Sequence, residues 1–197
     1  MDTKKLINEF VRRLPMDIDP LFKESLLEDG NIFELPKGAT FVYEGEKQQK
    51  IYYTIKGSCI RFIINPNGEE RAVMFHTEDF MPMVGNMYID SKDSLVTFLL
   101  KSNEDMTVLE LDSSFGLKWI NKDHAFARFV FQTSIQYLSN VNQIQNHLLG
   151  LSSEDFLCWL LKRYGFLFQR FRSKDIANFM GVTPIWLSNL KRKIAEK

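Results

Sequence analysis

The stretch SKDIANFMGVTPIWLSNLKRKI, residues 173–194, predicts two short helices joined by a tight turn. Ser173 is a suitable N-cap for the first helix, and Gly181 ends it because glycine tolerates the positive φ of a tight turn. Thr183 followed by Pro184 predicts the start of the second helix, since the hydroxyl accepts a free backbone N–H and proline has none to satisfy. The pattern is typical of a helix-turn-helix.

The two faces of the second helix differ in chemistry. Leu187, Leu190 and Ile194 recur at helical spacing and face inward over Val182, while small Ala177 lets the two helices cross closely. The opposite face is polar and basic and can enter a DNA major groove. The predicted DNA-contacting residues are Thr183, Pro184, Ile185, Ser188, Asn189, Lys191, Arg192, Lys193, Lys174 and Arg172.

The charge distribution supports a DNA-binding end. The whole chain is neutral, yet residues 170–197 contain seven Lys or Arg against two Asp or Glu, and the rest contains 18 against 23. A basic patch on a neutral chain is the electrostatic footprint of a phosphate-binding surface. The alternative interpretation is a basic helical hairpin whose charged face is only solvated.

Composition sets the class of protein. With 197 residues, 45% of them hydrophobic and 25% charged, the chain can form one large or two small globular domains. It has no apolar run long enough for a signal peptide or a membrane span. Its two cysteines, Cys59 and Cys158, cannot supply a four-thiolate cluster, and they favour a reducing, cytoplasmic location.

The first 120 residues predict a β-barrel sensor domain. Two short helices, at 3–14 and 21–27, precede runs rich in β-branched and aromatic residues that are separated by turn signals such as Asn67-Gly68. The runs are 31–35, 40–43, 51–56, 58–64, 69–75, 94–101 and 107–111. Strands at such spacing predict a sandwich or jelly roll, so the fold class is α+β.

Residues 121–150 predict one long helix with an apolar stripe. The stripe consists of Phe131, Ile135, Leu138, Val141, Ile144 and Leu148. Such a helix extends beyond its own domain, and a second copy of the chain is the simplest partner, with Asn142 or Gln145 able to fix the register. Packing against its own barrel is the alternative. A helix capped by Ser152 then opens a third region, 151–197, which holds the helix-turn-helix.

This order of parts, with the turn Glu44-Gly45-Glu46 and the run IYYTIKG at 51–57, resembles the cyclic-AMP receptor protein/FNR family of bacterial transcription regulators. The resemblance implies a homodimer that binds double-stranded DNA, with a cyclic-nucleotide-binding-like barrel as sensor, the long helix as dimer interface and RNA polymerase as a candidate partner. It implies no enzymatic activity and no membrane association.

Departures from the family pattern bear on the signal. Members that bind cyclic nucleotides carry Gly-Glu followed about ten residues later by Arg-Ser or Arg-Thr, which hold the ribose and the phosphate. Here the corresponding stretches read FMPMVG at 80–85 and SKDS at 91–94, and no arginine occurs between Arg71 and Arg128. Two cysteines cannot hold an iron–sulfur cluster, and His76 alone is more typical of a satisfied polar residue than of a haem ligand. No cofactor and no metal are therefore predicted.

The second helix of the helix-turn-helix, which would read the DNA, also departs from the family pattern. Pro184, Ile185 and Asn189 occupy places where well-studied relatives carry Arg, Glu and Arg. Asn189 can read adenine and Ile185 a thymine methyl, which favours an A·T-leaning site. No β-hairpin wing follows the helix, so the neighbouring basic residues would supply the phosphate affinity.

An unknown small-molecule effector is expected in the barrel. The predicted pocket residues are Phe62, Met74, Phe75, Met83, Val84, Phe98, Phe126 and Phe129. Two other functions remain open. An enzyme on a metal-binding barrel would need converging histidines, and His76, His124 and His147 fit this poorly. A small-molecule or cyclic-nucleotide sensor whose terminal helices bind a protein is the alternative to a DNA-binding regulator.

Overall fold

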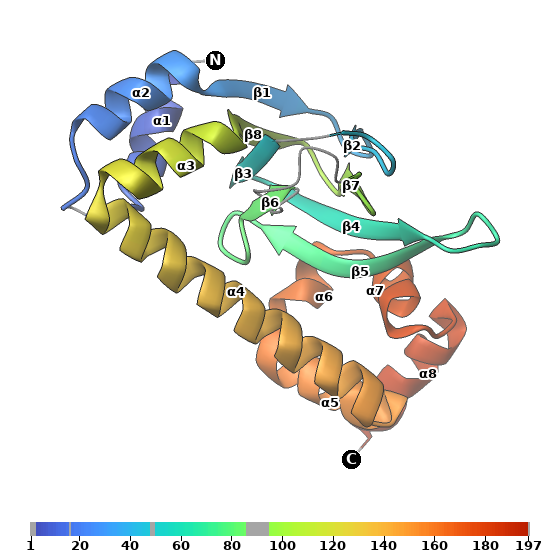
Figure 1. Cartoon of the computed structure of the whole chain (residues 1–197). Coiled ribbons are helices and arrows are strands. Elements are labelled where there is room, and N and C mark those ends of the chain that lie inside the picture. Colours follow the sequence, from blue (N-terminus) through green and yellow to red (C-terminus); the bar gives the residue numbers. More distant parts are fainter. Residues whose placement is uncertain (1–2, 16, 48–49, 86–94, 197) are drawn as a thin grey trace.

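The computed structural model describes residues 3–15, 17–47, 50–85 and 95–196. Two four-stranded antiparallel sheets face each other as a jelly roll, with helices at its N-terminal side and a helical C-terminal part below it (Figure 1). The fold is α+β, as predicted. No helix in the described part of the chain is long and apolar enough to cross a membrane.

The strand order is that of a roll rather than of a meander. The first sheet has the order β1-β8-β3-β6, built from Asn31–Leu35, Met106–Asp112, Lys50–Lys56 and Met83–Gly85. The second has the order β2-β7-β4-β5, built from Thr40–Val42, Leu99–Ser102, Ser58–Ile64 and Glu70–Thr77. Apolar residues of both sheets, among them Tyr52 and Leu100, meet in a buried core.

Two strand predictions needed correction. The short β6 was not predicted, because its three residues follow Pro82 and are too few to show an alternating pattern. The strand predicted at 94–101 is β7, which begins only at Leu99. Leu95 makes an isolated antiparallel bridge to Lys47, and residue 94 lies outside the described residues.

Helices cover the outer face of the first sheet. They are α1 (Thr3–Val11), α2 (Leu21–Asp29), α3 (Ser113–Lys122) and the start of α4 (His124–Gly150). Their core is aromatic: the ring of Phe22 lies 5.1 Å from that of Trp119 and 4.7 Å from that of Phe126. This packing fixes the first turns of the long helix against the barrel.

The helical segment that was predicted from about 121 contains a break at Asp123. The side chain of Asp123 accepts hydrogen bonds from the backbone N–H groups of Ala125 at 2.8 Å and Phe126 at 3.1 Å, so it is the N-cap of α4. It also accepts one from Asp19 at 2.6 Å. A separate helix, α3, therefore precedes the long one.

Four helices form the C-terminal part: α5 (Ser153–Tyr164), α6 (Phe166–Arg170), α7 (Ser173–Met180) and α8 (Pro184–Ala195). The Ser152 cap is confirmed, since its hydroxyl accepts from the N–H of Asp155 at 3.2 Å. The short α6 was not predicted. The Ser173 cap was wrong: α7 begins there, Arg172 is the N-cap residue, and no side chain caps it.

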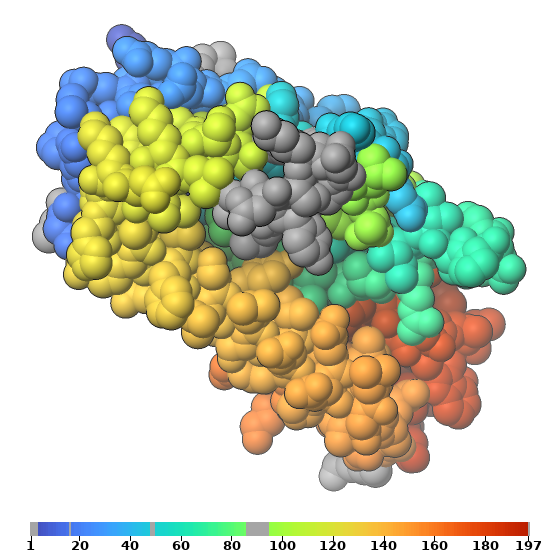
Figure 2. Space-filling view, viewed as in Figure 1, coloured from blue at the N-terminus to red at the C-terminus, as the bar shows by residue number. Residues whose placement is uncertain are grey.

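The C-terminal helices share a hydrophobic core with the second sheet. The ring of Phe75 on β5 lies 4.6 Å from that of Phe171 and 5.2 Å from that of Phe179. Ile60 and Met74 from the same sheet belong to this core. The helix-turn-helix therefore rests directly on the barrel, and α4 runs along the molecule from one part to the other (Figure 2).

Candidate nucleic-acid interface and sensor pocket

The helix-turn-helix has the geometry that its sequence predicts. Gly181 ends α7 with φ at 71°, in the left-handed region that glycine tolerates. The hydroxyl of Thr183 caps α8 by accepting from the N–H of Trp186 at 3.1 Å. Ala177 and Leu187 are fully buried where the helices cross. The second helix is thus held at a fixed angle, with its outer face free.

The outer face of α8 carries both apolar and polar side chains. Ile185 is 76% exposed and Trp186 is 53% exposed, beside exposed Ser188, Asn189 and Arg192. Trp186 was missed as a candidate. The signal was present, because the inward positions 187, 190 and 194 leave position 186 facing outward.

The predicted basic residues divide into paired and free groups. Arg172 is bound to Asp175 at 2.7 Å, and Lys193 pairs with Glu154. Lys191 has its ammonium 4.8 Å above the ring of Phe168. Among the described residues, the two other predicted phosphate contacts, Arg192 and Lys174, have no ion-pair partner, and both are exposed.

The first helix of the helix-turn-helix, α7, is anchored on the edge strand β5. The amide oxygen of Asn178 accepts from the N–H of Ala72 at 2.5 Å, and its amide N–H donates to the carbonyl of Glu70 at 3.1 Å. A Cβ at Gly181 would lie 2.9 Å from the guanidinium of Arg71. Beside this contact lies a cleft of about 920 Å³, which is lined by Thr183 of the turn and by barrel residues such as Phe62 and Lys101.

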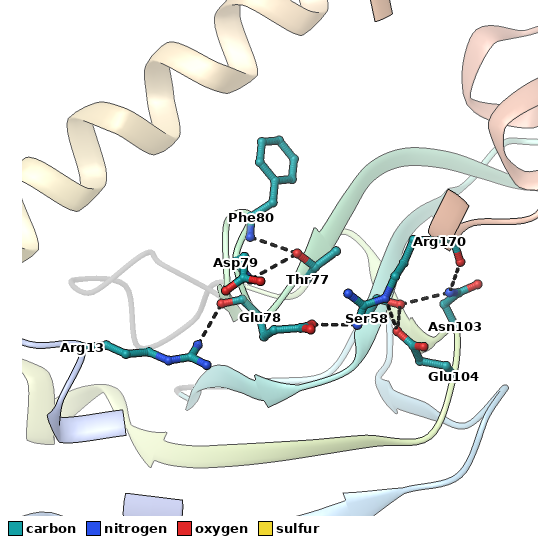
Figure 3. Close-up of polar contacts among 9 residues, drawn as sticks. All are labelled: Arg13, Ser58, Thr77, Glu78, Asp79, Phe80, Asn103, Glu104 and Arg170. Carbon is teal, nitrogen blue, oxygen red and sulfur yellow. Dashed lines mark hydrogen bonds and ion pairs between the residues drawn. The ribbon is translucent and has the colours of Figure 1, made fainter. Parts of the chain in front are cut away.

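A polar cluster joins α6 to two turns of the barrel (Figure 3). The guanidinium of Arg170 binds Glu78 and Glu104, each at 2.8 Å. Ser58 donates to the same oxygen of Glu104 at 2.6 Å, and Asn103 donates to the carbonyl of Arg170 at 3.1 Å. We call these five residues the Arg170 cluster. Sequence reasoning missed it, because its members are far apart in the sequence: Arg170 and Glu78 alone are separated by 92 residues.

The contacts within the Arg170 cluster stabilise the charged forms of Glu78 and Arg170. Burial alone would raise the pKa of Glu78, but the hydrogen bond from Arg170 and the charges of Arg170 and Arg13 outweigh it and lower the pKa below 4.5. The hydrogen bond to Glu78 likewise raises the pKa of Arg170. Arg13 also donates to the backbone carbonyl of Glu78 at 3.0 Å. The N-terminal segment, the barrel and the C-terminal helices thus meet at Glu78.

The predicted apolar stripe of α4 divides into two. Phe131, Ile135 and Leu138 are 66%, 51% and 53% exposed. Ile144, at 2% exposed, is buried in the core of the C-terminal part, where Val141 and Leu148 pack beside it. These last three therefore do not belong to a free dimer face as predicted: they face α5 of their own chain.

The exposed stripe continues along different residues. From Phe131, Ile135 and Leu138, alternating steps of three and four lead to Asn142, Gln145 and Leu149. All three are exposed, Leu149 to 85%. This is heptad spacing along one side of the helix. Leu149 was missed, because the sequence pattern follows the buried stripe equally well.

The predicted pocket residues do not come together. Phe62, Met74 and Phe75 lie in the core between the barrel and the C-terminal helices, and Val84 and Phe98 lie between the sheets. Of the predicted residues, only Met83, Phe126 and Phe129 line a common cavity, of about 320 Å³, between the first sheet and helices α1 to α4.

Within the part of the barrel that the structure describes, histidine and acidic residues do not form a metal centre. No three His, Cys, Asp or Glu residues within the described ranges converge on one point. His76 is fully buried and its Nδ1 lies 2.9 Å from the carbonyl of Met81. Burial lowers its pKa to about 3, so it is neutral. The cassette positions 91–94 lie outside the described residues.

Comparisons with known proteins show the same architecture. No protein-family model matches the sequence, and neither does any curated protein. Among solved structures, FixK2 of Bradyrhizobium japonicum is similar with a TM-score of 0.68 and 15% identity over 85% of both chains. The c-di-GMP-responsive global regulator CLP of Xanthomonas campestris is similar with a TM-score of 0.69 and 15% identity, and the match covers 90% of this chain and 92% of that one. The catabolite activator protein of Thermus thermophilus is similar with a TM-score of 0.51 and 19% identity, and the match covers 92% of this chain and 85% of that one. The chain therefore has the fold of the cyclic-AMP receptor protein/FNR regulators, which its sequence resembles.

Proposed function

We propose that this chain is a member of the cyclic-AMP receptor protein/FNR family and a sequence-specific, DNA-binding transcription regulator of the cytoplasm. The observation that carries the proposal is the helix-turn-helix with an exposed second helix at the basic end of a neutral chain. A fold shared with bacterial regulators supports it. The chain acts as a homodimer, and RNA polymerase is a further partner for an activator.

The proposed dimer interface is the exposed stripe of α4. Three large apolar side chains, Phe131, Ile135 and Leu138, are each more than half exposed on one face of a 27-residue helix. Heptad spacing lets a second copy bury them in a parallel pair of helices. Two α8 helices would then read half-sites about 34 Å apart, one turn of DNA, on a near-palindromic site.

The outer face of α8 sets the proposed base preference. The Asn189 amide can form two hydrogen bonds to adenine, and Ile185 with Trp186 offers apolar contact to thymine methyl groups. Arg192 and Lys174 are free to bind phosphates. An A·T-leaning half-site is the expected result.

The barrel is the proposed sensor, and its signal is not a cyclic nucleotide. Asn178 and the Arg170 cluster fix the helix-turn-helix on the same barrel that packs against the first turns of α4. A signal that changes this packing would shift the spacing of the two reading helices. The response would then appear as a change in DNA affinity.

A salt titration tests DNA binding against the alternative of a protein-binding module. With six to ten phosphate contacts, affinity for a random-sequence duplex should fall by roughly 10³ to 10⁵ between 50 and 200 mM salt. Arg192→Gln should weaken binding and reduce the salt slope, whereas Lys23→Gln, on α2, should change neither. Salt-independent or undetectable DNA binding would contradict the proposal.

A further inference from the structure

The cavity outside the barrel has mostly apolar walls. It encloses about 320 Å³, which is within the range of small-molecule sites. Its walls are mostly aromatic and aliphatic and come from the first sheet and from helices α1, α2, α3 and α4. The walls include Phe10, Tyr53, Phe115, Ile120, Phe126 and Phe129.

A charged side chain, that of Arg13, lines this apolar cavity. Arg13 is the one charged residue among the described residues that line it, and its side chain is exposed. One terminal nitrogen donates to the carbonyl of Glu78 at 3.0 Å. A guanidinium has five N–H donors in a planar fork, so further donors remain for a ligand. The fork matches the two oxygens of a carboxylate.

We propose that this cavity binds an apolar carboxylate of the fatty-acid class. The hydrocarbon part occupies the space between the first sheet and α3, and the carboxylate binds the guanidinium of Arg13. Burial of the ligand's hydrocarbon part supplies the affinity, and the charge-assisted hydrogen bonds from Arg13 supply the selectivity for an acid. The inference deepens the proposed function, on which it rests for its regulatory consequence, by giving the ligand class of the sensor.

The position of the cavity links the ligand to both regulatory elements. Val130, Thr133 and Ser134 of α4 line the cavity. Phe131 and Ile135, in the same two turns of α4, lie on another side of the helix and belong to the exposed stripe. Arg13 is bound to Glu78, which holds Arg170 of the C-terminal part. A bound acid would therefore contact the proposed dimer helix and engage the arginine that is tied to the Arg170 cluster.

The test is isothermal titration calorimetry of the full chain with decanoate, and with 1-decanol as its uncharged analogue. Decanoate should bind once per chain and more tightly than 1-decanol. Arg13→Gln should weaken decanoate at least about tenfold, since it removes hydrogen bonds to a charged group, and should leave 1-decanol unchanged. The control Arg12→Gln alters a neighbouring exposed arginine that does not line the cavity.

A second variant locates the site without touching a charge. Gly116 of α3 lines the cavity, and a Cβ there would lie 3.8 Å from the nearest atom of Ile51, an ordinary contact. Gly116→Leu should fill the cavity and abolish decanoate binding. Gly116→Ala should keep binding, and thermal unfolding should show both variants folded.

Two results would overturn the proposal. Decanoate that binds Gly116→Leu as well as wild type does not occupy this cavity. Equal binding of decanoate by wild type and Arg13→Gln means that the arginine is not the anchor. DNA affinity measured on the same variants separates this failure from that of the proposed function. DNA binding that persists without decanoate binding overturns only the ligand, and decanoate binding without DNA binding overturns only the regulator.

Discussion

The two halves of α4 have the same apolar spacing and opposite surroundings. In the first half, Phe131, Ile135 and Leu138 are more than half exposed, while in the second half Ile144 is 2% exposed beneath α5. Apolar periodicity therefore identifies a face of a helix but not the partner that covers it. The first half offers a surface to another chain, and the second half is the foundation of the chain's own DNA-reading part.

A charge introduced into the exposed half of α4 should have the largest effect, which is a loss of dimer affinity. Leu138→Glu would bury one unpaired carboxylate from each chain in the proposed interface, at a cost of about 3–5 kcal/mol for each. We expect the dimer dissociation constant, measured by sedimentation, to rise at least about 100-fold with an unchanged circular dichroism spectrum. Gln136→Glu, exposed on another side of α4, is the control. A monomeric wild type, or a Leu138→Glu dimer of normal affinity, would break the comparison.

Truncation in the buried half should instead destabilise the fold. Ile144→Ala should lower the free energy of unfolding by about 2–5 kcal/mol, because it leaves a cavity in the core. Leu149→Ala, at a side chain that is 85% exposed, should change it by less than about 0.5 kcal/mol in the monomer. Urea denaturation at low protein concentration measures both. Similar losses for the two variants would show that Ile144 is not held in the core of the C-terminal part.

The Arg170 cluster, which joins α6 to the barrel, should contribute a smaller amount to the free energy of unfolding. Arg170→Gln leaves Glu78 and Glu104 without their shared cation, at an expected cost of about 1–2 kcal/mol for partly exposed groups. Arg128→Gln breaks the exposed pair with Asp17 and should cost less than about 0.5 kcal/mol. Equal costs in urea denaturation would mean that the cluster is only a surface contact.

Acid should weaken the cluster gradually. Since the folded state lowers the pKa of Glu78, its stabilising contribution is complete above the ordinary carboxyl pKa of 4.5 and is lost as the pH falls through the lower folded value. The wild type should therefore lose more unfolding free energy below about pH 4.5 than Arg170→Gln does. The lowered pKa of Asp123, whose first cause is the N–H of Asp19, is common to both proteins. Parallel stability curves against pH would refute this role of Glu78.

Local signals made much of the fold predictable. Gly181, Thr183 and Pro184 fix the helix-turn-helix through backbone geometry that neighbouring residues determine, and Asn67-Gly68 fixes a hairpin. The second helix of the motif consequently lies where its sequence places it. Alternating runs likewise gave most strands to within two residues.

Contacts between distant residues were beyond sequence reasoning. Arg170 meets Glu78 and Glu104 only because α6 packs beneath two barrel turns, and no periodicity records that meeting. The predicted pocket failed for a related reason: Phe62 lies on β4 and Phe98 directly precedes β7, yet the two rings belong to different cores. The core that a side chain enters depends on how the two sheets pack in the folded barrel, and the sequence of one strand does not record this.

The measurement that tests the account most directly is selection of bound sequences from a random duplex pool at near-physiological salt. The purified chain should enrich a two-fold symmetric, A·T-leaning motif with half-sites one DNA turn apart. Leu138→Glu should lose that symmetric motif. Failure to enrich any sequence, or enrichment of a single asymmetric site that Leu138→Glu binds equally well, would contradict a dimeric regulator that reads DNA through α8.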